Sequence, residues 1–473
     1  MSETADRLGA EVGLGLDEVL AATRGDLVRL GDRLRFPGVT TDTRAIRPGE
    51  LFVAIRGETH DGHRFLAEAA HQGAGAVLSE RTEAEEPLPC TVVAVRDTLA
   101  ALGDLAAFHR RRHRTRVLAV AGSNGKTTTK EMAAAILRHA LGPEAVLHTR
   151  GTQNNLVGLP LTLLRLGDAH AVAVLELGMN GPGEVWRLAE IADPDAGVVT
   201  CVAPEHLEGV GSLHGAAEAE AELFRRLRPS ATAIVNADDP LVVAGAEGFP
   251  GRVLRFGTGG DVRADEIVDL GLGGSTFRLS VGSESVPVRL SIPGRHNVGN
   301  ALAAAALTSL AGASLADVRD ALAAFEGPSM RMQVERVAGG VTVINDAYNA
   351  NPASMAAALQ TLAASPATRR IAVLGEMREL GDETETAHEQ LGRLAGTAGL
   401  DALLVVGAHA GLVRQGALAA GMDGARITIA ADQVEAAERL GALCRPGDLV
   451  LLKASRGAAL ESVLRHLGRE GDA

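Results

Sequence analysis

Residues 119–129 read AVAGSNGKTTT. The stretch begins inside an apolar run, Val117–Val120, and continues directly beyond it. A strand, a glycine-rich turn and the first residues of a helix form the context in which backbone N–H groups can surround a polyphosphate. Gly122 and Gly125 stand where the backbone must approach the phosphates closely, which only glycine permits. The stretch therefore predicts a phosphate-binding loop made of Gly122, Ser123, Asn124, Gly125, Lys126, Thr127 and Thr128.

Two side chains of this loop have the chemistry of nucleotide binding. Lys126 would bridge the β- and γ-phosphates, and the Thr127 hydroxyl would reach Mg²⁺. The spacing departs from the general G-x-x-x-x-G-K-T pattern, because Val120 stands where the first glycine is expected. A glycine-rich turn with a chance Gly-Lys-Thr is the alternative interpretation of these residues.

Composition excludes several classes of protein. The chain has 473 residues, which indicates two or three domains, and its 46% hydrophobic content is ample for their cores. A net charge of -13 and an aromatic content of 2% argue against nucleic acid as the main partner. The three cysteines lie far apart, the Met1–Thr4 start has no basic signal region, and no apolar run is long enough for a membrane helix. We therefore expect a cytoplasmic protein that does not insert into membranes.

Short β-rich runs alternate with helical patterns along most of the chain, which favours an α/β fold with a doubly wound, largely parallel sheet. Between about 252 and 292 the pattern changes to alternating runs typical of antiparallel hairpins, and one Ala-rich helix is expected from Asn300 to near Phe325. A basic cluster at Arg110–Arg116 and the pair Gly327-Pro328 mark candidate boundaries. The charges of this cluster and of Lys130 are expected to be solvated helix charges. The predicted domains are 1–113, 114–327 and 328–473.

Several segments, in order, resemble the Mur ligase family, whose phosphate loop has the same shortened form as residues 122–127. The sequence carries Glu176-Leu177-Gly178 after the second central strand, His206-Leu207-Glu208, the stretch RHNVGN at 295–300, and Met330-Arg331. Taken singly, Glu176, His206 and Asn300 have plain structural interpretations, as a strand-end charge, a hydrogen-bonded histidine and a helix cap. The order and spacing of the segments support the family resemblance.

Within that family, four further segments resemble its D-alanyl-D-alanine-adding branch. They are NNLVGLP at 154–160, NDAYNANP at 345–352, LGEMRELG at 374–381 and KASR at 453–456. The resemblance implies an ATP- and Mg²⁺-dependent ligase that joins D-alanyl-D-alanine to UDP-N-acetylmuramoyl-tripeptide in peptidoglycan synthesis, acting as a monomer. It also implies a small N-terminal α/β domain that binds the UDP-sugar, a central ATP-binding P-loop domain and a C-terminal Rossmann-like ligase domain. Another carboxylate–amine ligase of the superfamily, or a nucleotide-binding protein that has lost catalysis, are the alternatives.

The resemblance assigns roles to particular residues. A carboxylate is a poor acyl donor, so ATP would first convert it to an acyl phosphate, which the acceptor amine then attacks. The residues expected in catalysis are Lys126, Glu176, His206, Arg331 and Asp346. Besides the loop, those expected to hold the nucleotide are Asn297, Asn300, Arg331, Asp346, Tyr348 and Asn349. Those expected to bind the other substrates are Asp42, Thr43, Arg44, Asp61, Gly62, His63, Asn154, Asn155, Asn351, Lys453, Ser455 and Arg456.

The expected metal ligands are Thr127 and Glu176 for one Mg²⁺, and His206 and Glu220 for a second. Mur ligases commonly carry a lysine, carbamylated by CO₂, at the position that Glu220 occupies here. A carboxylate supplies the same negative charge without CO₂ on a shorter stem. The alternative hypothesis is that Glu218, Glu220 and Glu222 form a solvated acidic helix face. We further expect flexible domain connections, with Arg331 and Asp346 far from the phosphate loop when no substrate is bound.

Overall fold

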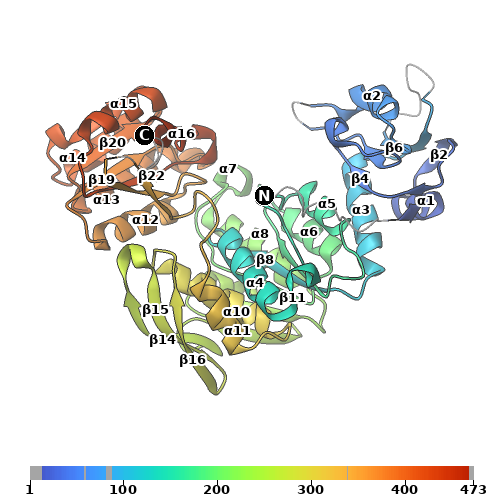
Figure 1. Cartoon of the computed structure of the whole chain (residues 1–473), viewed down its shortest axis with the longest axis horizontal. Helices are drawn as coiled ribbons and strands as arrows, with labels where there is room; N and C mark the ends of the chain where they lie inside the picture. The colour runs from blue at the N-terminus through green and yellow to red at the C-terminus, as the bar shows by residue number, and fades with distance from the viewer. Residues whose placement is uncertain (1–12, 58–59, 81–87, 338, 468–473) are drawn as a thin grey trace.

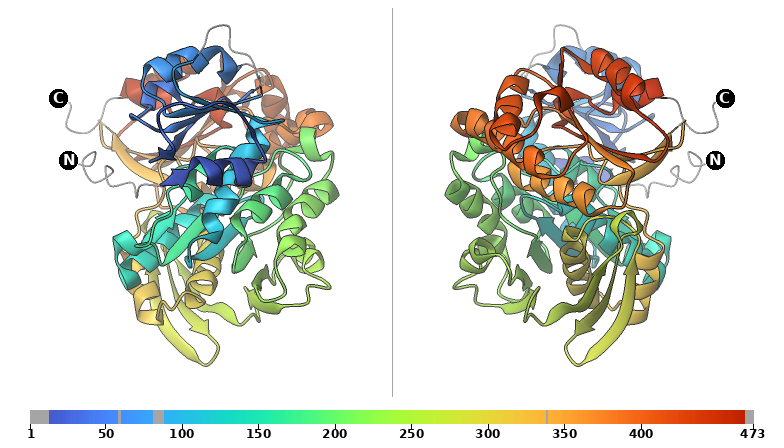
Figure 2. Two further views of the ribbon diagram at one scale, coloured as in Figure 1. Left: turned by 90° about the vertical axis from the view of Figure 1, so that its right-hand side faces the viewer. Right: turned by 90° about the vertical axis from the view of Figure 1, so that its left-hand side faces the viewer.

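The computed structural model describes residues 13–57, 60–80, 88–337 and 339–467. The Met1–Thr4 start lies outside this range. Three lobes, each built on its own principal sheet, are visible in Figure 1, with the middle lobe between the other two, and Figure 2 shows them from two sides. No helix within the described ranges is long and apolar enough to cross a membrane.

The N-terminal lobe holds a five-stranded sheet in the order β2-β7-β6-β5-β4, parallel except for β2. A short antiparallel pair, β1 with β3, lies beside it. The elements of this lobe are β1 (Leu14–Gly15), α1 (Leu16–Thr23), β2 (Asp26–Arg29), β3 (Arg35–Phe36), β4 (Val39–Thr40), η2 (Thr43–Ala45), β5 (Leu51–Val53), η3 (Gly62–Phe65), α2 (Leu66–His71), β6 (Ala76–Ser79), β7 (Thr91–Ala94) and α3 (Thr98–Arg111).

The middle lobe contains a nine-stranded sheet in the order β16-β15-β14-β13-β12-β11-β8-β10-β9. Its strands are parallel from β9 to β14, and β14, β15 and β16 form the antiparallel hairpins expected from the sequence. Its strands are β8 (Arg116–Ala121), β9 (Val146–His148), β10 (Val172–Glu176), β11 (Ala196–Val199), β12 (Thr232–Asn236), β13 (Arg252–Phe256), β14 (Val262–Asp269), β15 (Ser275–Val281) and β16 (Glu284–Leu290). Its helices are α4 (Lys126–Leu141), α5 (Gly158–Leu163), α6 (Glu184–Ala192), α7 (Leu207–Val210), α8 (Leu213–Arg226), α9 (Pro240–Gly245), α10 (His296–Ser309) and α11 (Leu315–Ala323).

The C-terminal lobe contains a six-stranded sheet in the order β17-β18-β22-β19-β20-β21, parallel except for β17. Its strands are β17 (Gln333–Val337), β18 (Val341–Asn345), β19 (Arg369–Leu374), β20 (Ala402–Val406), β21 (Ile427–Ala430) and β22 (Asp448–Lys453). Its helices are α12 (Pro352–Ala364), α13 (Thr384–Thr397), α14 (Ala410–Ala419), α15 (Gln433–Leu443) and α16 (Ser462–Leu467). The predicted α/β class with a central parallel sheet is confirmed, whereas the domain boundaries after 113 and 327 stay predictions.

Strand β8 explains why the middle sheet is covered on both faces. Its residues after Arg116, Val117–Ala121, are all apolar and fully buried, as expected for a central parallel strand. Leu118 and Val120 pack into a cluster with α4, α10 and α11, whereas Val117 and Ala119 join a cluster that includes α5, α6 and α8. Because β10 and β11 lie on opposite sides of β8, the chain opens a crevice at the carboxyl end of β8, where ligands bind in such folds.

Three expectations about individual segments are wrong. The helix expected from Asn300 to Phe325 is two helices, α10 and α11, because the chain reverses around Gly312, where φ is +90°. Lys130, expected as a solvated helix charge, is completely buried and donates a 2.8 Å hydrogen bond to the Thr149 carbonyl. Arg110, expected to be solvated as well, is buried against the end of α6.

Candidate active site

The phosphate loop joins β8 to α4 at the middle of the nine-stranded sheet. Gly122 and Gly125 have φ values of +117° and +86°. A Cβ at Gly122 would lie 2.2 Å from the Thr200 hydroxyl, and one at Gly125 would lie 2.2 Å from Asn300 Oδ1. Any side chain is therefore both strained and blocked at these positions. The helix α4 begins at Lys126, so its unpaired N–H groups and its dipole favour an anion at the loop.

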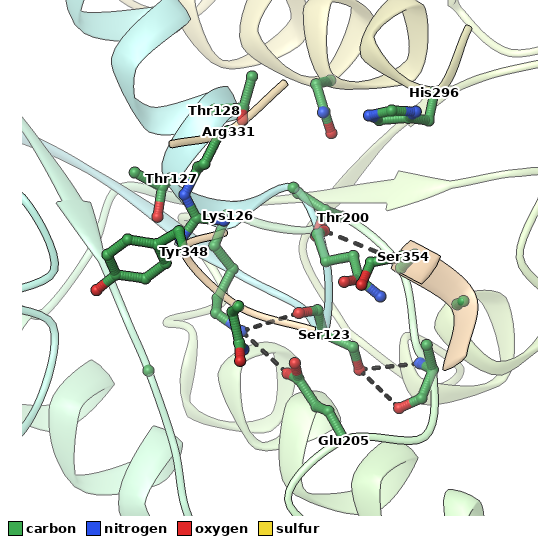
Figure 3. A pocket seen from close by; sticks show the side chains of 18 of the residues that line it. Ser123, Lys126, Thr127, Thr128, Thr200, Glu205, His296, Arg331, Tyr348 and Ser354 are labelled. Carbon is green, nitrogen blue, oxygen red and sulfur yellow. Dashed lines mark hydrogen bonds and ion pairs between the residues drawn. The ribbon is translucent and has the colours of Figure 1, made fainter. Parts of the chain in front are cut away.

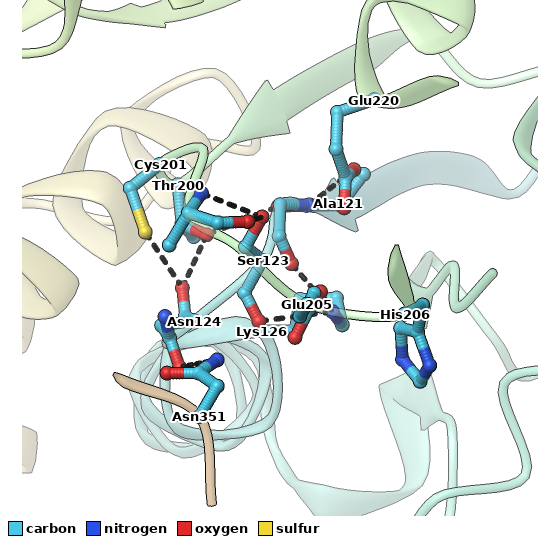
Figure 4. A network of polar contacts seen from close by, with 12 residues as sticks. Ala121, Ser123, Asn124, Lys126, Thr200, Cys201, Glu205, His206, Glu220 and Asn351 are labelled. Atoms are coloured by element: carbon cyan, nitrogen blue, oxygen red, sulfur yellow. Dashed lines mark hydrogen bonds and ion pairs between the residues drawn. The ribbon is translucent and has the colours of Figure 1, made fainter. Parts of the chain in front are cut away.

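Polar contacts fix the loop against the segment that follows β11 (Figure 4). The Thr200 hydroxyl donates to the Asn124 carbonyl at 2.6 Å. The Ser123 hydroxyl donates to the Ala203 carbonyl at 3.1 Å and accepts from the Ala203 N–H at 2.9 Å. The two segments therefore move as one unit, and the loop is preorganised by the protein itself.

Lys126 points back into the loop rather than toward open space (Figure 3). Its Nζ donates to the carbonyls of Gly122 at 2.5 Å and Ser123 at 3.2 Å, and to Glu205 Oε1 at 3.0 Å. Burial disfavours the charged lysine, but the carboxylates of Glu205 and Glu220 outweigh that effect and raise the pKa of Lys126. The lysine is therefore a permanent cation at the floor of the site.

Glu176, at the carboxyl end of β10, lies beside the first turn of α4. Its Oε1 accepts hydrogen bonds from Thr127 Oγ1 at 3.0 Å and from Asn154 Nδ2 at 2.9 Å. Its Oε2 is buried and has no hydrogen-bond partner within the described residues. A buried carboxylate oxygen beside a hydroxyl suits a hard divalent cation such as Mg²⁺. Among the described residues no three His, Cys, Asp or Glu side chains form a complete metal cage, so phosphate oxygens and water would have to supply the other ligands.

His206 forms an ion pair with Glu379 of the C-terminal lobe through its Nδ1. Burial lowers the pKa of His206, but the hydrogen bond to Glu379 and the charge of Glu205 more than compensate and raise it. The backbone of His206 is left-handed, with φ of 51°, which turns the imidazole out of α7. The histidine therefore stands where the middle and C-terminal lobes meet.

Glu220 is enclosed behind the loop, with 1% of its surface exposed. Its Oε2 accepts a 2.6 Å hydrogen bond from the Gly122 N–H, whereas its Oε1 is buried without a partner in the described part of the chain. Desolvation raises the pKa of Glu220 to about 7, although Lys126 opposes this shift. The hypothesis of a solvated acidic face is wrong for Glu220, although Glu218 is exposed and pairs with Arg225 at 2.7 Å.

A cavity of about 650 Å³ joins these groups to the C-terminal lobe. Seventeen of the residues predicted for the site line it, namely Ser123, Asn124, Gly125, Lys126, Thr127, Thr128, Asn154, Asn155, Glu176, His206, Asn297, Asn300, Arg331, Asp346, Tyr348, Asn349 and Lys453. The predicted residues that do not line it are Gly122, Glu220, Asn351, Ser455, Arg456, Asp42, Thr43, Arg44, Asp61, Gly62 and His63.

The two lobes are in contact across this cavity, which Arg331 and Asp346 line together with residues of the loop. Their separation when no substrate is bound stays a prediction. The Arg331 guanidinium lies 4.4 Å from the centre of the Tyr348 ring. The Tyr348 hydroxyl donates to Thr152 Oγ1 in the middle lobe at 2.6 Å. The Tyr348–Thr152 hydrogen bond connects the two lobes, whereas the Arg331–Tyr348 contact lies within the C-terminal lobe.

The other C-terminal residues brace one another. Asp346 pairs with Lys453 at 2.5 Å, and Lys453 also donates to the Asn349 carbonyl at 3.1 Å. The Ser455 hydroxyl donates to the Ala350 carbonyl at 3.3 Å. Arg456 pairs with Glu461 at 2.7 Å and lies 5.9 Å from the Tyr348 ring. This arrangement holds the loop after β18 in a shape that faces the phosphate loop.

Asn297 and Asn300 lie on the first turn of α10. Asn300 Nδ2 donates to Asn297 Oδ1 at 2.8 Å, and Asn297 Nδ2 donates to the Pro293 carbonyl at 2.7 Å. The Thr129 hydroxyl donates to Asn300 Oδ1 at 3.4 Å. This chain of amides connects α10 to α4 at the edge of the cavity.

The N-terminal residues predicted to bind substrate form two capped turns outside the cavity. Asp42 accepts from the Arg44 guanidinium at 2.7 Å, and Thr43 is buried between them. Asp61 Oδ1 contacts His63 Nδ1 at 2.7 Å, and a Cβ at Gly62 would lie 2.8 Å from the Ile55 carbonyl. These motifs therefore stabilise the two turns, and their role in binding substrate stays a prediction.

Sequence reasoning did not assign two carboxylates of the site. Glu205 contacts Lys126, and Glu379 contacts His206. Both stand in segments that the sequence singled out, next to His206 and inside residues 374–381 respectively. Their position alone does not tell which way a side chain points, so only the folded structure identifies their partners.

The comparisons with known proteins agree with this geometry. The Mur ligase family, catalytic domain profile matches residues 35–110, the Mur ligase middle domain profile matches 120–308, and the Mur ligase, glutamate ligase domain profile matches 330–456. The chain belongs to the Mur ligase family. Fold and phosphate loop alike place it among the nucleotide-dependent ligases of that family.

Individual relatives and solved structures show which members of the family the chain is similar to. The UDP-N-acetylmuramoyl-tripeptide–D-alanyl-D-alanine ligase of Escherichia coli (strain K12) is 39% identical over 470 residues, covering 97% of this chain and 99% of the relative. The crystal structure of MurF from Acinetobacter baumannii has a TM-score of 0.88 at 33% identity, covering 96% of this chain and 98% of that one. MurF from Thermotoga maritima in complex with ADP has a TM-score of 0.80 at 28% identity, covering 91% and 96%.

Proposed function

We propose that the chain is an ATP-dependent UDP-N-acetylmuramoyl-tripeptide–D-alanyl-D-alanine ligase of peptidoglycan synthesis. The observation that carries the proposal is the meeting of Lys126 with Arg331 and Asp346 in one cavity, in a chain similar over nearly its whole length to ligases of that name. The products would be the extended UDP-N-acetylmuramoyl-pentapeptide, ADP and phosphate.

The nucleotide would lie with its phosphates on the loop at the start of α4. Lys126 and Arg331 line the same cavity and would neutralise charge as the γ-phosphoryl group transfers to the tripeptide carboxylate. Thr127 and Glu176 would hold Mg²⁺, with His206 and Glu220 contributing toward a second ion. When bound, Mg²⁺ supplies Lewis-acid polarisation of the phosphoryl oxygens.

The contact between lobes supports a mechanism that needs water excluded. An acyl phosphate hydrolyses readily, so the acceptor amine must meet it in a closed site. The Tyr348–Thr152 contact and the 3.0 Å hydrogen bond from Asn351 Nδ2 to Asn124 Oδ1 hold the C-terminal lobe over the loop. These residues orient and enclose the reactants, and their opening would release the products.

We further propose that the three lobes are the domains 1–113, 114–327 and 328–473, and that the N-terminal one holds the uridine end of the donor. The turns at Asp42–Arg44 and Asp61–His63 support this, because each presents polar groups on a rigid capped loop. Monomeric state and cytoplasmic location belong to the same proposal.

A phosphate-release assay tests the function directly. Purified protein is incubated with ATP, Mg²⁺ and UDP-N-acetylmuramoyl-tripeptide, with D-alanyl-D-alanine or single amino acids as acceptor. Release that requires both the donor and the dipeptide, with formation of the pentapeptide product, is the expected result. Release with a single amino acid instead would indicate that the chain is another carboxylate–amine ligase. No release with any acceptor would indicate a nucleotide-binding protein without ligase activity.

A further inference from the structure

The ammonium group of Lys126 has all its hydrogen bonds satisfied within the protein. A protonated lysine has three N–H donors. Here they reach the Gly122 carbonyl, the Ser123 carbonyl and Glu205 Oε1, at 2.5, 3.2 and 3.0 Å. A polyphosphate that binds Lys126 must therefore displace at least one of these acceptors.

Glu205 is the acceptor that carries a charge, and it lies in a fixed position. It is 5% exposed and lines the cavity that receives the nucleotide. The segment that carries it is tied to the loop through both hydrogen bonds between Ser123 and Ala203. The Glu205 carboxylate therefore stands where a phosphate oxygen would compete for the lysine. The two hydrogen bonds limit how far its segment can move with Lys126.

We propose that Glu205 is a counter-ion that the nucleotide displaces. Glu205 pairs with Lys126 while the site is empty, and the polyphosphate takes its place as the partner of the lysine when the nucleotide binds. The physical reason is that a buried ammonium without a counter-charge is costly. Glu205 removes that cost in the empty protein but makes the nucleotide compete for the lysine. It is a positioning residue, because it acts through Lys126 rather than on the reacting atoms. The proposal rests on the proposed ATP-dependent function.

The test measures ADP binding by calorimetry in EDTA, so that no divalent cation contributes. Glu205→Gln keeps the shape of the side chain and removes its charge. We expect it to lower the Kd for ADP by about tenfold, the effect of one hydrogen bond between charged groups. Glu218→Gln removes the same formal charge at an exposed position and should leave the Kd unchanged.

A double-mutant cycle separates competition from plain repulsion between Glu205 and the phosphates. Repulsion acts whether or not residue 126 is a lysine, whereas competition requires the lysine. We expect the fold-change caused by Glu205→Gln to be larger in the wild-type background than in the Lys126→Ala background. Equal fold-changes in the two backgrounds, or weaker ADP binding by Glu205→Gln, would overturn the proposal.

Thermal unfolding of the nucleotide-free proteins is a second measurement. Glu205→Gln is expected to destabilise the nucleotide-free protein, although it is expected to strengthen ADP binding. Glu205→Gln should lower the Tm when Lys126 is present, because it removes a counter-ion, and should not lower it when residue 126 is alanine. A fall of the same size in both backgrounds would show a merely structural role for Glu205. If the wild-type protein binds no ADP at all, the proposed function fails; if it binds ADP but the cycle shows no coupling, only the counter-ion role fails.

Discussion

At the scale of single residues, Lys126 of the phosphate loop stands among three carboxylates. Lys126 feels the charges of Glu205, Glu220 and Glu176. This excess of negative charge suits divalent cations but opposes a bare polyphosphate. The pKa of Lys126, a residue predicted from the phosphate loop, thus depends on carboxylates that come from other elements.

Lys126→Ala is expected to lower the rate of phosphate release far more than tenfold. The substitution removes a preorganised charge from the transferring phosphoryl group, and tenfold corresponds to only about 1.4 kcal/mol of transition-state stabilisation. Steady-state phosphate release with both substrates measures the effect, and thermal unfolding checks that the variant is folded. A variant that keeps more than about a tenth of the wild-type rate would remove Lys126 from catalysis.

Glu220→Gln is expected to raise the Mg²⁺ concentration needed for half-maximal activity severalfold, while activity stays independent of bicarbonate. The reason is that Glu220 has one buried oxygen without a partner among the described residues, and that the resemblance to Mur ligases implies a metal-binding carbamylated lysine at its position. Glu218→Gln is the matched control, since that carboxylate is exposed and paired with Arg225. Identical Mg²⁺ curves for the two variants would make Glu220 a brace for the Gly122 N–H alone.

At the scale of elements, two helices carry contacts that their sequences do not reveal. Asn351 caps α12 by accepting from the Ser354 N–H at 2.9 Å, and its amide also donates to Asn124. α3 contacts the middle lobe through His109, whose Nε2 lies 3.0 Å from the Leu166 carbonyl. Each residue therefore serves both its own helix and a contact between lobes.

Asn351 allows these two roles to be separated. Asn351→Ser keeps an N-cap acceptor but loses the amide donor, whereas Asn351→Ala loses both. We expect only the alanine variant to lose about 1 kcal/mol of unfolding free energy. Both variants should show a raised KM for ATP if the contact with Asn124 helps to close the site. Urea unfolding and steady-state kinetics measure the two effects, and an unchanged KM in both variants would limit Asn351 to capping.

His109 predicts a pH dependence of stability. Burial lowers its pKa from 6.5 to about 4, because the charged imidazole is desolvated where α3 contacts the middle lobe. Between these values the unfolded chain binds more protons than the native one, so stability falls as the pH is lowered from 6.5 toward 4. The contribution is at most about 3 kcal/mol. Urea unfolding should show a flatter profile for His109→Gln, whereas the same change at exposed His71 should keep the wild-type slope.

At the scale of the whole molecule, the three lobes present different parts of the ligand path. The nucleotide cavity lies between the middle and C-terminal lobes, and the capped turns of the N-terminal lobe lie outside it. If the N-terminal turns hold the uridine end of the donor, as proposed, the donor has to reach from these turns to the cavity, and the lobes then act together on one substrate.

Arg44→Ala is expected to weaken binding of the UDP-sugar peptide severalfold while ADP binding stays unchanged. Arg44 is exposed on the N-terminal turn, where its guanidinium is fixed by Asp42 and is available to a diphosphate. Calorimetry with each ligand separates the two effects, and Arg29→Ala, an exposed arginine of β2, is the control. Undiminished binding of the UDP-sugar peptide would place the uridine end elsewhere.

The sequence by itself determined the fold class and the phosphate loop, because both depend on local patterns. Buried β-strands read as apolar runs, and Gly122 and Gly125 occupy positions where any side chain is blocked. The tertiary structure alone decided that the lobes are closed, that Lys130 is buried, and that Glu205 and Glu379 face Lys126 and His206. These facts depend on which segments, distant in sequence, are brought together in space. The direction of a side chain and the burial of its charge follow from that arrangement, which no local pattern encodes.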